Sequence, residues 1–198
     1  MRKLTFALFS ILLIFFGLSA YGQMSEDNSN FWTVHRDTQT MFRISYPRDW
    51  VVAHPKGPNV RFSVYPPDGA GNCNVVVRHA PELKNFTQKE LSDQLSLFPQ
   101  DSAGLADLLG LPASGVHVID SRMGKVWDIP AWISTVETKL VNLEGEFSRY
   151  QIVVVILKPA EIWNINCGVT LSGATEAKIR FTVLKPKFVK MLGSFVFL

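Results

Sequence analysis

Three long segments near the end of the chain alternate apolar and polar residues and follow one another through short turns. They span residues 130–142, 146–158 and 162–171, with "NLEGE" as the first of these turns. Alternation with a period of two is typical of strands that bury one face. Strands joined by short turns pair antiparallel. The segments therefore predict an antiparallel meander, and any fold of this chain has to be built around it.

Earlier parts of the chain carry the same strand signals in shorter form. Turn-forming residues such as "VYPPDGAGN" separate them. These signals predict further strands over residues 31–36, 41–46, 60–65, 73–79 and 115–122.

Helical signals are few. Thr87 to Glu90, "TQKE", has the form of a capping box, which predicts a helix from Thr87 to about Pro99. The segment "SAGLADLLGL" predicts a short helix ended by Gly110 and Pro112. Pro186 suits a first helical turn, so a last helix is expected from there to Gly193. Strands in one mainly antiparallel sheet, with a helix layer on each face, make an α+β domain.

The N-terminus has the pattern of an export signal. Arg2 and Lys3 precede a short apolar run, and small residues follow, which predicts a signal peptide over residues 1–22. An uncleaved anchor is the alternative, although the apolar run is shorter than the roughly 20 residues of a spanning helix. Residues 23–30 are polar and predict a flexible lead-in, and residues 31–198 predict a single domain. The protein is thus expected to be secreted or periplasmic, with no integral membrane segment after cleavage.

Charge excludes one class of partner. Without residues 1–22 the chain keeps 18 basic and 17 acidic residues, interspersed along its length. A nearly neutral chain has no electrostatic footprint for nucleic acid.

The two cysteines, Cys73 and Cys167, each lie on the apolar face of a predicted strand. An exported protein is in a compartment where disulfides persist, so we expect the two residues to form one. Two separate buried thiols are the alternative, because a free cysteine packs as a small hydrophobic residue.

Tyr46, Pro47 and Trp50 form the pattern Tyr-Pro-x-x-Trp, and Ser194 and Phe195 form a Ser-Phe pair after the expected last helix. These two motifs, and the order of motifs along most of residues 31–198, resemble the PsbP-like superfamily. That superfamily includes the photosystem II protein PsbP, a Ran-binding nuclear protein and bacterial envelope proteins of the DcrB type. The resemblance implies an α/β/α sandwich whose members dock on larger partners. The secretory leader differs from that of the plant proteins, so an oxygen-evolution role is not implied.

The Tyr-Pro-x-x-Trp turn also has a physical explanation. Pro47 donates no backbone hydrogen bond and so ends the strand, which lets Trp50 fold back over the end of the core. A Trp50 that stacks on a ligand is the alternative.

No catalytic motif occurs in the sequence, so we expect no enzyme and no cofactor. Nucleophile elbows, S-x-x-K and H-E-x-x-H are all absent. The four histidines are scattered singly and are expected at the surface or at strand ends: His35, His54, His79 and His117. A site assembled from distant residues is the alternative, since metal ligands need only converge in space.

Trp127 and Trp132 flank "DIPA" at a predicted turn. Packing in the core or its rim is one interpretation, and an exposed anchor for a partner is the other. The sequence thus favours an exported, non-enzymatic binding or assembly module that docks on another envelope protein. A carrier of a small molecule or metal ion, with a pocket between sheet and helices, is the second hypothesis.

Overall fold

The computed structural model describes residues 31–54, 57–97, 101–109, 115–142 and 145–198. The predicted signal peptide and lead-in, residues 1–30, lie outside the described residues. The chain divides into Met1–Phe31 and Trp32–Leu198, and the fold below is that of the second unit. No helix among the described residues is long and apolar enough to cross a membrane.

In this unit, strands and helices occur mostly in separate runs along the chain. In chain order they are β1 (Trp32–Asp37), β2 (Phe42–Pro47), β3 (Val51–Val52), β4 (Val60–Tyr65), β5 (Asn72–His79), a short 3₁₀ turn (Pro81–Leu83), α1 (Gln88–Leu97), α2 (Ser102–Leu109), β6 (Val116–Val126), β7 (Ile129–Asn142), β8 (Gly145–Lys158), β9 (Glu161–Leu171), α3 (Ala174–Gly193) and β10 (Val196–Phe197).

The strands form two sheets, where the sequence predicted one. A seven-stranded sheet has the order β3-β4-β5-β9-β8-β7-β6, and a small sheet has the order β1-β2-β10. Every described pairing is antiparallel, which confirms the predicted meander of β7, β8 and β9. The split arises at the Pro47 turn, because the chain leaves the ladder of β2 there and re-enters the other sheet as β3.

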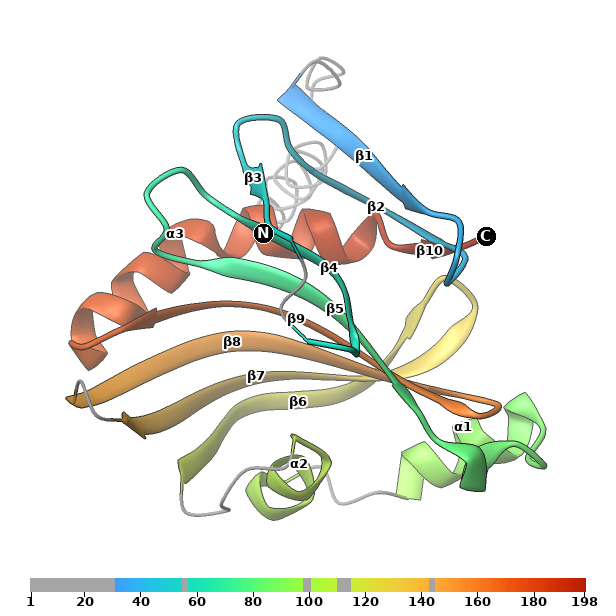
Figure 1. The fold of residues 1–198 in the computed structure, drawn as a ribbon. Coiled ribbons are helices and arrows are strands. Elements are labelled where there is room, and N and C mark those ends of the chain that lie inside the picture. The colour runs from blue at the N-terminus through green and yellow to red at the C-terminus, as the bar shows by residue number, and fades with distance from the viewer. Residues whose placement is uncertain (1–30, 55–56, 98–100, 110–114, 143–144) are drawn as a thin grey trace, which may run out of the picture. The chain divides into compact units, whose positions relative to one another are not determined.

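Helices cover both faces of the large sheet, as Figure 1 shows, with α3 on one side and α1 and α2 on the other. The α3 side holds the larger core, and its members include Trp163, Phe188 and Phe195. The other side holds a smaller core around Trp132, closed by Leu95 of α1 and Leu105 of α2. The fold is therefore the expected α+β sandwich.

Helix α1 starts at the predicted capping box. The Thr87 backbone N–H and hydroxyl donate to the Glu90 carboxylate at 2.7 and 2.8 Å, and the Glu90 N–H donates to the Thr87 hydroxyl at 3.3 Å. These bonds hold the pKa of the Glu90 carboxyl below its ordinary value. The predicted end near Pro99 and the stop signals Gly110 and Pro112 lie outside the described residues.

The last helix is much longer than predicted. It starts at Ala174, and Pro186 lies inside it rather than at its first turn. An internal proline costs about 3 kcal/mol because it removes one hydrogen bond. Five buried side chains at helical spacing outweigh that cost by packing on the sheet: Ala177, Phe181, Leu184, Phe188 and Met191.

Candidate functional site

The Tyr-Pro-x-x-Trp turn acts in the architecture. The Trp50 N–H donates to the Pro47 carbonyl at 3.0 Å, which closes a tight turn after β2. The Trp50 ring is 4% exposed and meets Phe188 of α3 edge to face at 5.9 Å. Tyr46 lies on Phe62 of β4, with ring centroids 5.6 Å apart. These contacts place Trp50 in the core.

The Ser-Phe pair fastens the end of α3 to β2. The Ser45 N–H donates to the Ser194 hydroxyl at 2.8 Å, and that hydroxyl donates to the Met191 carbonyl at 2.7 Å. Phe195 is buried and stacks on Phe42, with ring centroids 5.4 Å apart. Both motifs therefore join the small sheet to α3 and the core.

The structure joins Cys73 and Cys167 in a disulfide. The two residues are direct partners on β5 and β9, and both are buried. The sequence pattern had placed each on an apolar face, and the strand register brings the two faces together.

The two tryptophans named as partner contacts have different environments. Trp132 is 1% exposed in the smaller core, so it cannot form an exposed anchor, and that part of the prediction is wrong. Side chains along β7 alternate between the two faces of the sheet, and the Trp132 side chain lies on the face that α1 and α2 cover. Trp127 is 60% exposed in the two-residue turn between β6 and β7. Its φ of 57° lies in the left-handed region.

The histidines do not converge. His54, His79 and His117 are exposed, as expected. His35 differs, because its ring is half-buried on Phe62 and Phe42, at centroid distances of 4.5 and 5.8 Å. Among the described residues, no three His, Cys, Asp or Glu side chains gather as metal ligands.

Stability is expected to fall in acid because of His35. Burial lowers the pKa of its imidazole below 6.5, and Asp37 offsets part of that shift. The unfolded chain then binds a proton more readily than the folded chain, so stability is full above 6.5 and declines as pH falls through the lowered pKa. Urea unfolding at about pH 7.5 and about pH 5 measures this loss. We expect a smaller loss in His35→Gln and an unchanged loss in the exposed control His117→Gln. Equal losses in His35→Gln and wild type would contradict the assignment.

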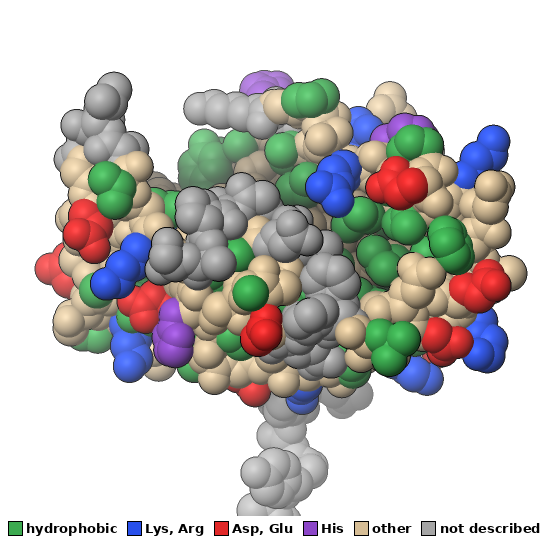
Figure 2. Space-filling view, turned by 90° about the horizontal axis from the view of Figure 1, so that it is seen from below, with side chains coloured by type: hydrophobic (Ala, Val, Ile, Leu, Met, Phe, Trp, Pro, Cys, Tyr) green, Lys and Arg blue, Asp and Glu red, His purple; other side chains and the backbone are tan. Residues whose placement is uncertain are grey.

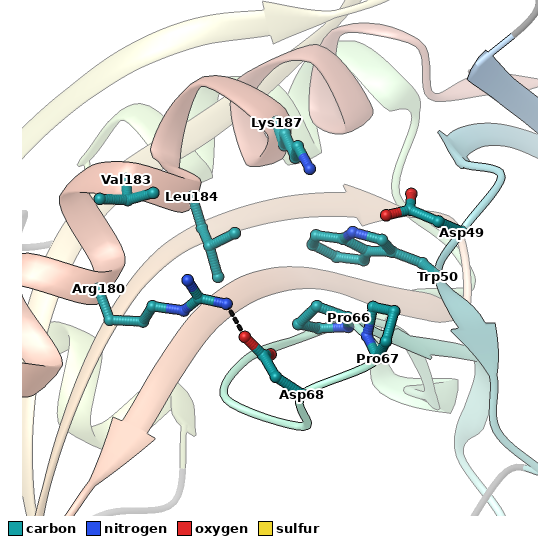
Figure 3. A pocket seen from close by; sticks show the side chains of 9 residues that line it. All are labelled: Asp49, Trp50, Pro66, Pro67, Asp68, Arg180, Val183, Leu184 and Lys187. Carbon is teal, nitrogen blue, oxygen red and sulfur yellow. Dashed lines mark hydrogen bonds and ion pairs between the residues drawn. The ribbon is translucent and has the colours of Figure 1, made fainter.

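A cleft of about 340 Å³ lies beside Trp50. Figure 3 shows the Trp50 ring between the prolines of the β4–β5 turn, Pro66 and Pro67, and side chains of α3. Arg180 of α3 forms an ion pair with Asp68 across one side of the cleft. The cleft thus has an apolar floor and a charged rim.

A polar ladder crosses the face of the large sheet that also carries α1 and α2. Ser63 donates to Asn74 at 2.7 Å, and Asn74 donates to Asn166 at 3.1 Å. Asn166 then donates to Asn164 at 3.2 Å, and Arg149 donates to the Asn166 carbonyl oxygen at 3.1 Å. We call these five residues the polar ladder.

The polar ladder lies beyond the helices, on β4, β5, β9 and one end of β8. Helices α1 and α2 pack on β6, β7 and β8. The ladder side chains are half-buried, so solvent reaches them. Figure 2, which looks at this side of the domain, shows basic and acidic side chains interspersed, with hydrophobic side chains in recesses between them.

The sequence analysis missed the polar ladder, although one signal was present. Asn164 and Asn166 alternate with Cys167 and its apolar neighbours, which put them on the opposite face. Nothing in that local pattern shows that Asn74, which is 92 residues away, lies beside Asn166.

No protein-family model matches this chain, and no curated protein matches it. Solved structures do. A PsbP protein of the cyanobacterium Synechocystis superposes with a TM-score of 0.54 at 13% identity, over 90% of this chain and 99% of that one. The Ran-binding protein Mog1p of Saccharomyces cerevisiae superposes with a TM-score of 0.50 at 11% identity, over 84% and 95%. The resemblance expected from the Tyr-Pro-x-x-Trp and Ser-Phe motifs is thereby confirmed at the level of architecture: the chain has the PsbP-like fold.

Proposed function

We propose that the protein is an exported, non-enzymatic binding module that docks on another envelope protein, and that Trp127 is a contact residue. The observation that carries this proposal is the conformation of Trp127. Its ring is 60% exposed and its φ is 57°.

The position of Trp127 disfavours a large side chain. A two-residue hairpin turn with positive φ selects Gly, Asn or Asp. A bulky residue in the left-handed region costs about 1 to 3 kcal/mol, and such strain clusters at functional sites. Among the described residues, no hydrogen bond or ring contact of the Trp127 side chain offsets this cost. Tryptophan is, however, enriched among residues that dominate binding. A partner that buries the Trp127 ring would account for the residue.

Two further observations support the binding and export parts of the proposal. One solved structure of the same fold is described as Ran-binding, so the fold supports protein recognition in that protein. The leader pattern of residues 1–22 and the disulfide fit an oxidising compartment outside the cytoplasm. The partner expected there is an envelope protein.

Trp127→Asn is expected to stabilise the protein and to abolish docking. Asparagine tolerates positive φ, so the free energy of unfolding should rise by about 1 kcal/mol. Thermal unfolding should show this as a Tm about 2 to 4 °C higher. An unchanged or lower Tm would mean that the turn carries no strain.

Docking is measured by crosslinking the tagged protein in its native envelope, followed by affinity capture and mass spectrometry. We expect one stoichiometric partner with wild type and its loss with Trp127→Asn. The matched control is Val141→Asn, which changes another exposed apolar residue, 81% exposed on β7. Capture of the same partner by Trp127→Asn would exclude Trp127 as a contact. Equal loss with Val141→Asn would make the effect nonspecific.

The cleft beside Trp50 favours a second candidate function, a carrier of a small molecule. Its volume of about 340 Å³ is at the lower end of the range for ligand pockets. Its apolar floor and the Arg180–Asp68 pair would give a ligand both contact area and orientation. Native mass spectrometry of the protein from its source tests this. A retained small molecule supports the carrier function, whereas the mass of the polypeptide alone supports the docking function.

A further inference from the structure

The polar ladder presents free hydrogen-bond donors. The Asn166 carbonyl oxygen accepts from both Asn74 and Arg149, which uses its two lone pairs. The Nδ2 groups of Asn74 and Asn166 each use one proton inside the ladder and keep the other. The Asn164 Nδ2 makes no hydrogen bond within the described part of the chain. Acceptor sites remain on Asn74 Oδ1, Asn164 Oδ1 and the Ser63 hydroxyl, but each of the three asparagines also keeps at least one free N–H group on this half-exposed surface.

Arg149 adds a positive charge to these donors. The ion pairs of the described residues join Lys89 to Asp93 and Arg180 to Asp68, so no described carboxylate neutralises Arg149. Its Nε is buried without a hydrogen-bond partner. Burial lowers the pKa of the guanidinium, which nevertheless remains charged at neutral pH. A partly buried, unpaired cation is costly unless an anion compensates it.

A second unsatisfied group lies next to Arg149. Thr138 of β7 is its direct cross-strand partner, so both side chains leave the sheet on the same face. The Thr138 hydroxyl is buried and has no hydrogen-bond partner. Arg149 and Thr138 thus place two unpaired polar groups side by side, whereas most buried polar groups are paired.

We propose that the polar ladder, including the Arg149 guanidinium, forms a binding site for an oxyanion, a carboxylate or phosphate group of a small solute. Such a group offers several acceptor oxygens and a negative charge, which match the free N–H groups of Asn74, Asn164 and Asn166 and the Arg149 guanidinium. Arg149 neutralises the charge, and the amides orient the oxygens along β5 and β9. The site lies on the opposite face of the sheet from α3, so it is separate from the cleft beside Trp50.

The test is NMR titration of the full-length mature protein with two probes, succinate and inorganic phosphate. The side-chain amide resonances of Asn74, Asn164 and Asn166 report binding directly. We expect saturable shifts of these resonances with at least one probe. Succinate alone identifies a carboxylate site, phosphate alone a phosphate site, and both a general oxyanion site. No saturable shift with either probe would overturn the proposal.

Variants separate a specific site from general charge. Arg149→Gln should weaken binding about tenfold or more, because it removes the charge-assisted hydrogen bonds. Asn166→Asp should also abolish binding, since its carboxylate would pair with Arg149. This second variant keeps the test valid if Arg149→Gln does not fold. Arg122→Gln makes the same change of net charge at an exposed position on β6 and should bind as wild type. Equal weakening by Arg122→Gln would overturn the proposal, and so would wild-type binding by Asn166→Asp.

Discussion

Reduction of the Cys73–Cys167 disulfide is expected to lower Tm by about 10 to 20 °C. The bridge joins residues 94 positions apart, and in the chain-entropy model a loop of that size contributes about 4 to 5 kcal/mol. For a domain of this size, 1 kcal/mol corresponds to about 2 to 4 °C. The stabilisation acts through the unfolded chain, which the bridge makes more compact. Urea unfolding should therefore show a lower m-value for the oxidised protein than for the reduced one.

The experiment compares oxidised protein with protein that was unfolded, reduced and refolded in reductant. Both cysteines are buried, so reductant added to the folded protein is not a sufficient treatment. Reduction leaves every core atom in place, whereas Cys73→Ala with Cys167→Ala also removes two buried sulfurs. The double variant should thus lose slightly more stability than the reduced wild type. Identical Tm values before and after reduction would show that the bridge carries no stability.

The local pattern predicted the strands well because each of them buries one face. The predicted segment 60–65 coincides with β4, and the three long strands begin within one residue of their predicted starts. The capping box at Thr87 likewise depends only on neighbours. Features of this kind depend only on residues that are close together in the sequence.

Features that depend on tertiary packing were missed. Pro186 signalled a helix start on local grounds, but the contacts of Phe181 and Phe188 with the core keep α3 continuous through it. The two-residue strands β3 and β10 have too few residues for any periodicity, and they exist only because β4 and β2 offer free edges. Trp132 and Trp127 have similar sequence surroundings, yet Trp132 is buried under the helix layer and Trp127 is exposed in the β6–β7 turn.

The same limit applies to the candidate sites. The sequence put Asn166 on a polar face, but its neighbours Ser63, Asn74 and Arg149 come from three other strands. Their meeting follows from the order β4-β5-β9-β8, in which β9 pairs with its sequence neighbour β8 on one side and with the distant strand β5 on the other. A single sequence holds no record of that order.

Gly168→Ala is expected to destabilise the protein by about 3 kcal/mol, with a drop in Tm of about 6 to 12 °C. Gly168 on β9 lies directly opposite Gln151 on β8. A Cβ at Gly168 would lie 2.5 Å from the Gln151 Cβ and 2.6 Å from the Tyr150 carbonyl oxygen. Neither atom is the end of a flexible side chain, so the two central strands would have to move apart. A glycine inside a strand often marks such a close approach of backbones.

The control is Gly193→Ala at the end of α3, where an added Cβ meets no atom within 4 Å. Alanine is the better helix former, so this variant should keep its stability or gain up to about 1 kcal/mol. Gln151→Gly in the Gly168→Ala background should restore only part of the loss, because the contact with the Tyr150 oxygen remains. Calorimetric melting of wild type, Gly168→Ala, Gln151→Gly and the double variant yields the coupling between the two positions. If Gly168→Ala has the same Tm as wild type, then β8 and β9 can move apart at little cost in free energy. The disulfide on the other side of β9 would then be the stronger constraint on that strand, since Cys167 ties it to β5 independently of its fit against β8.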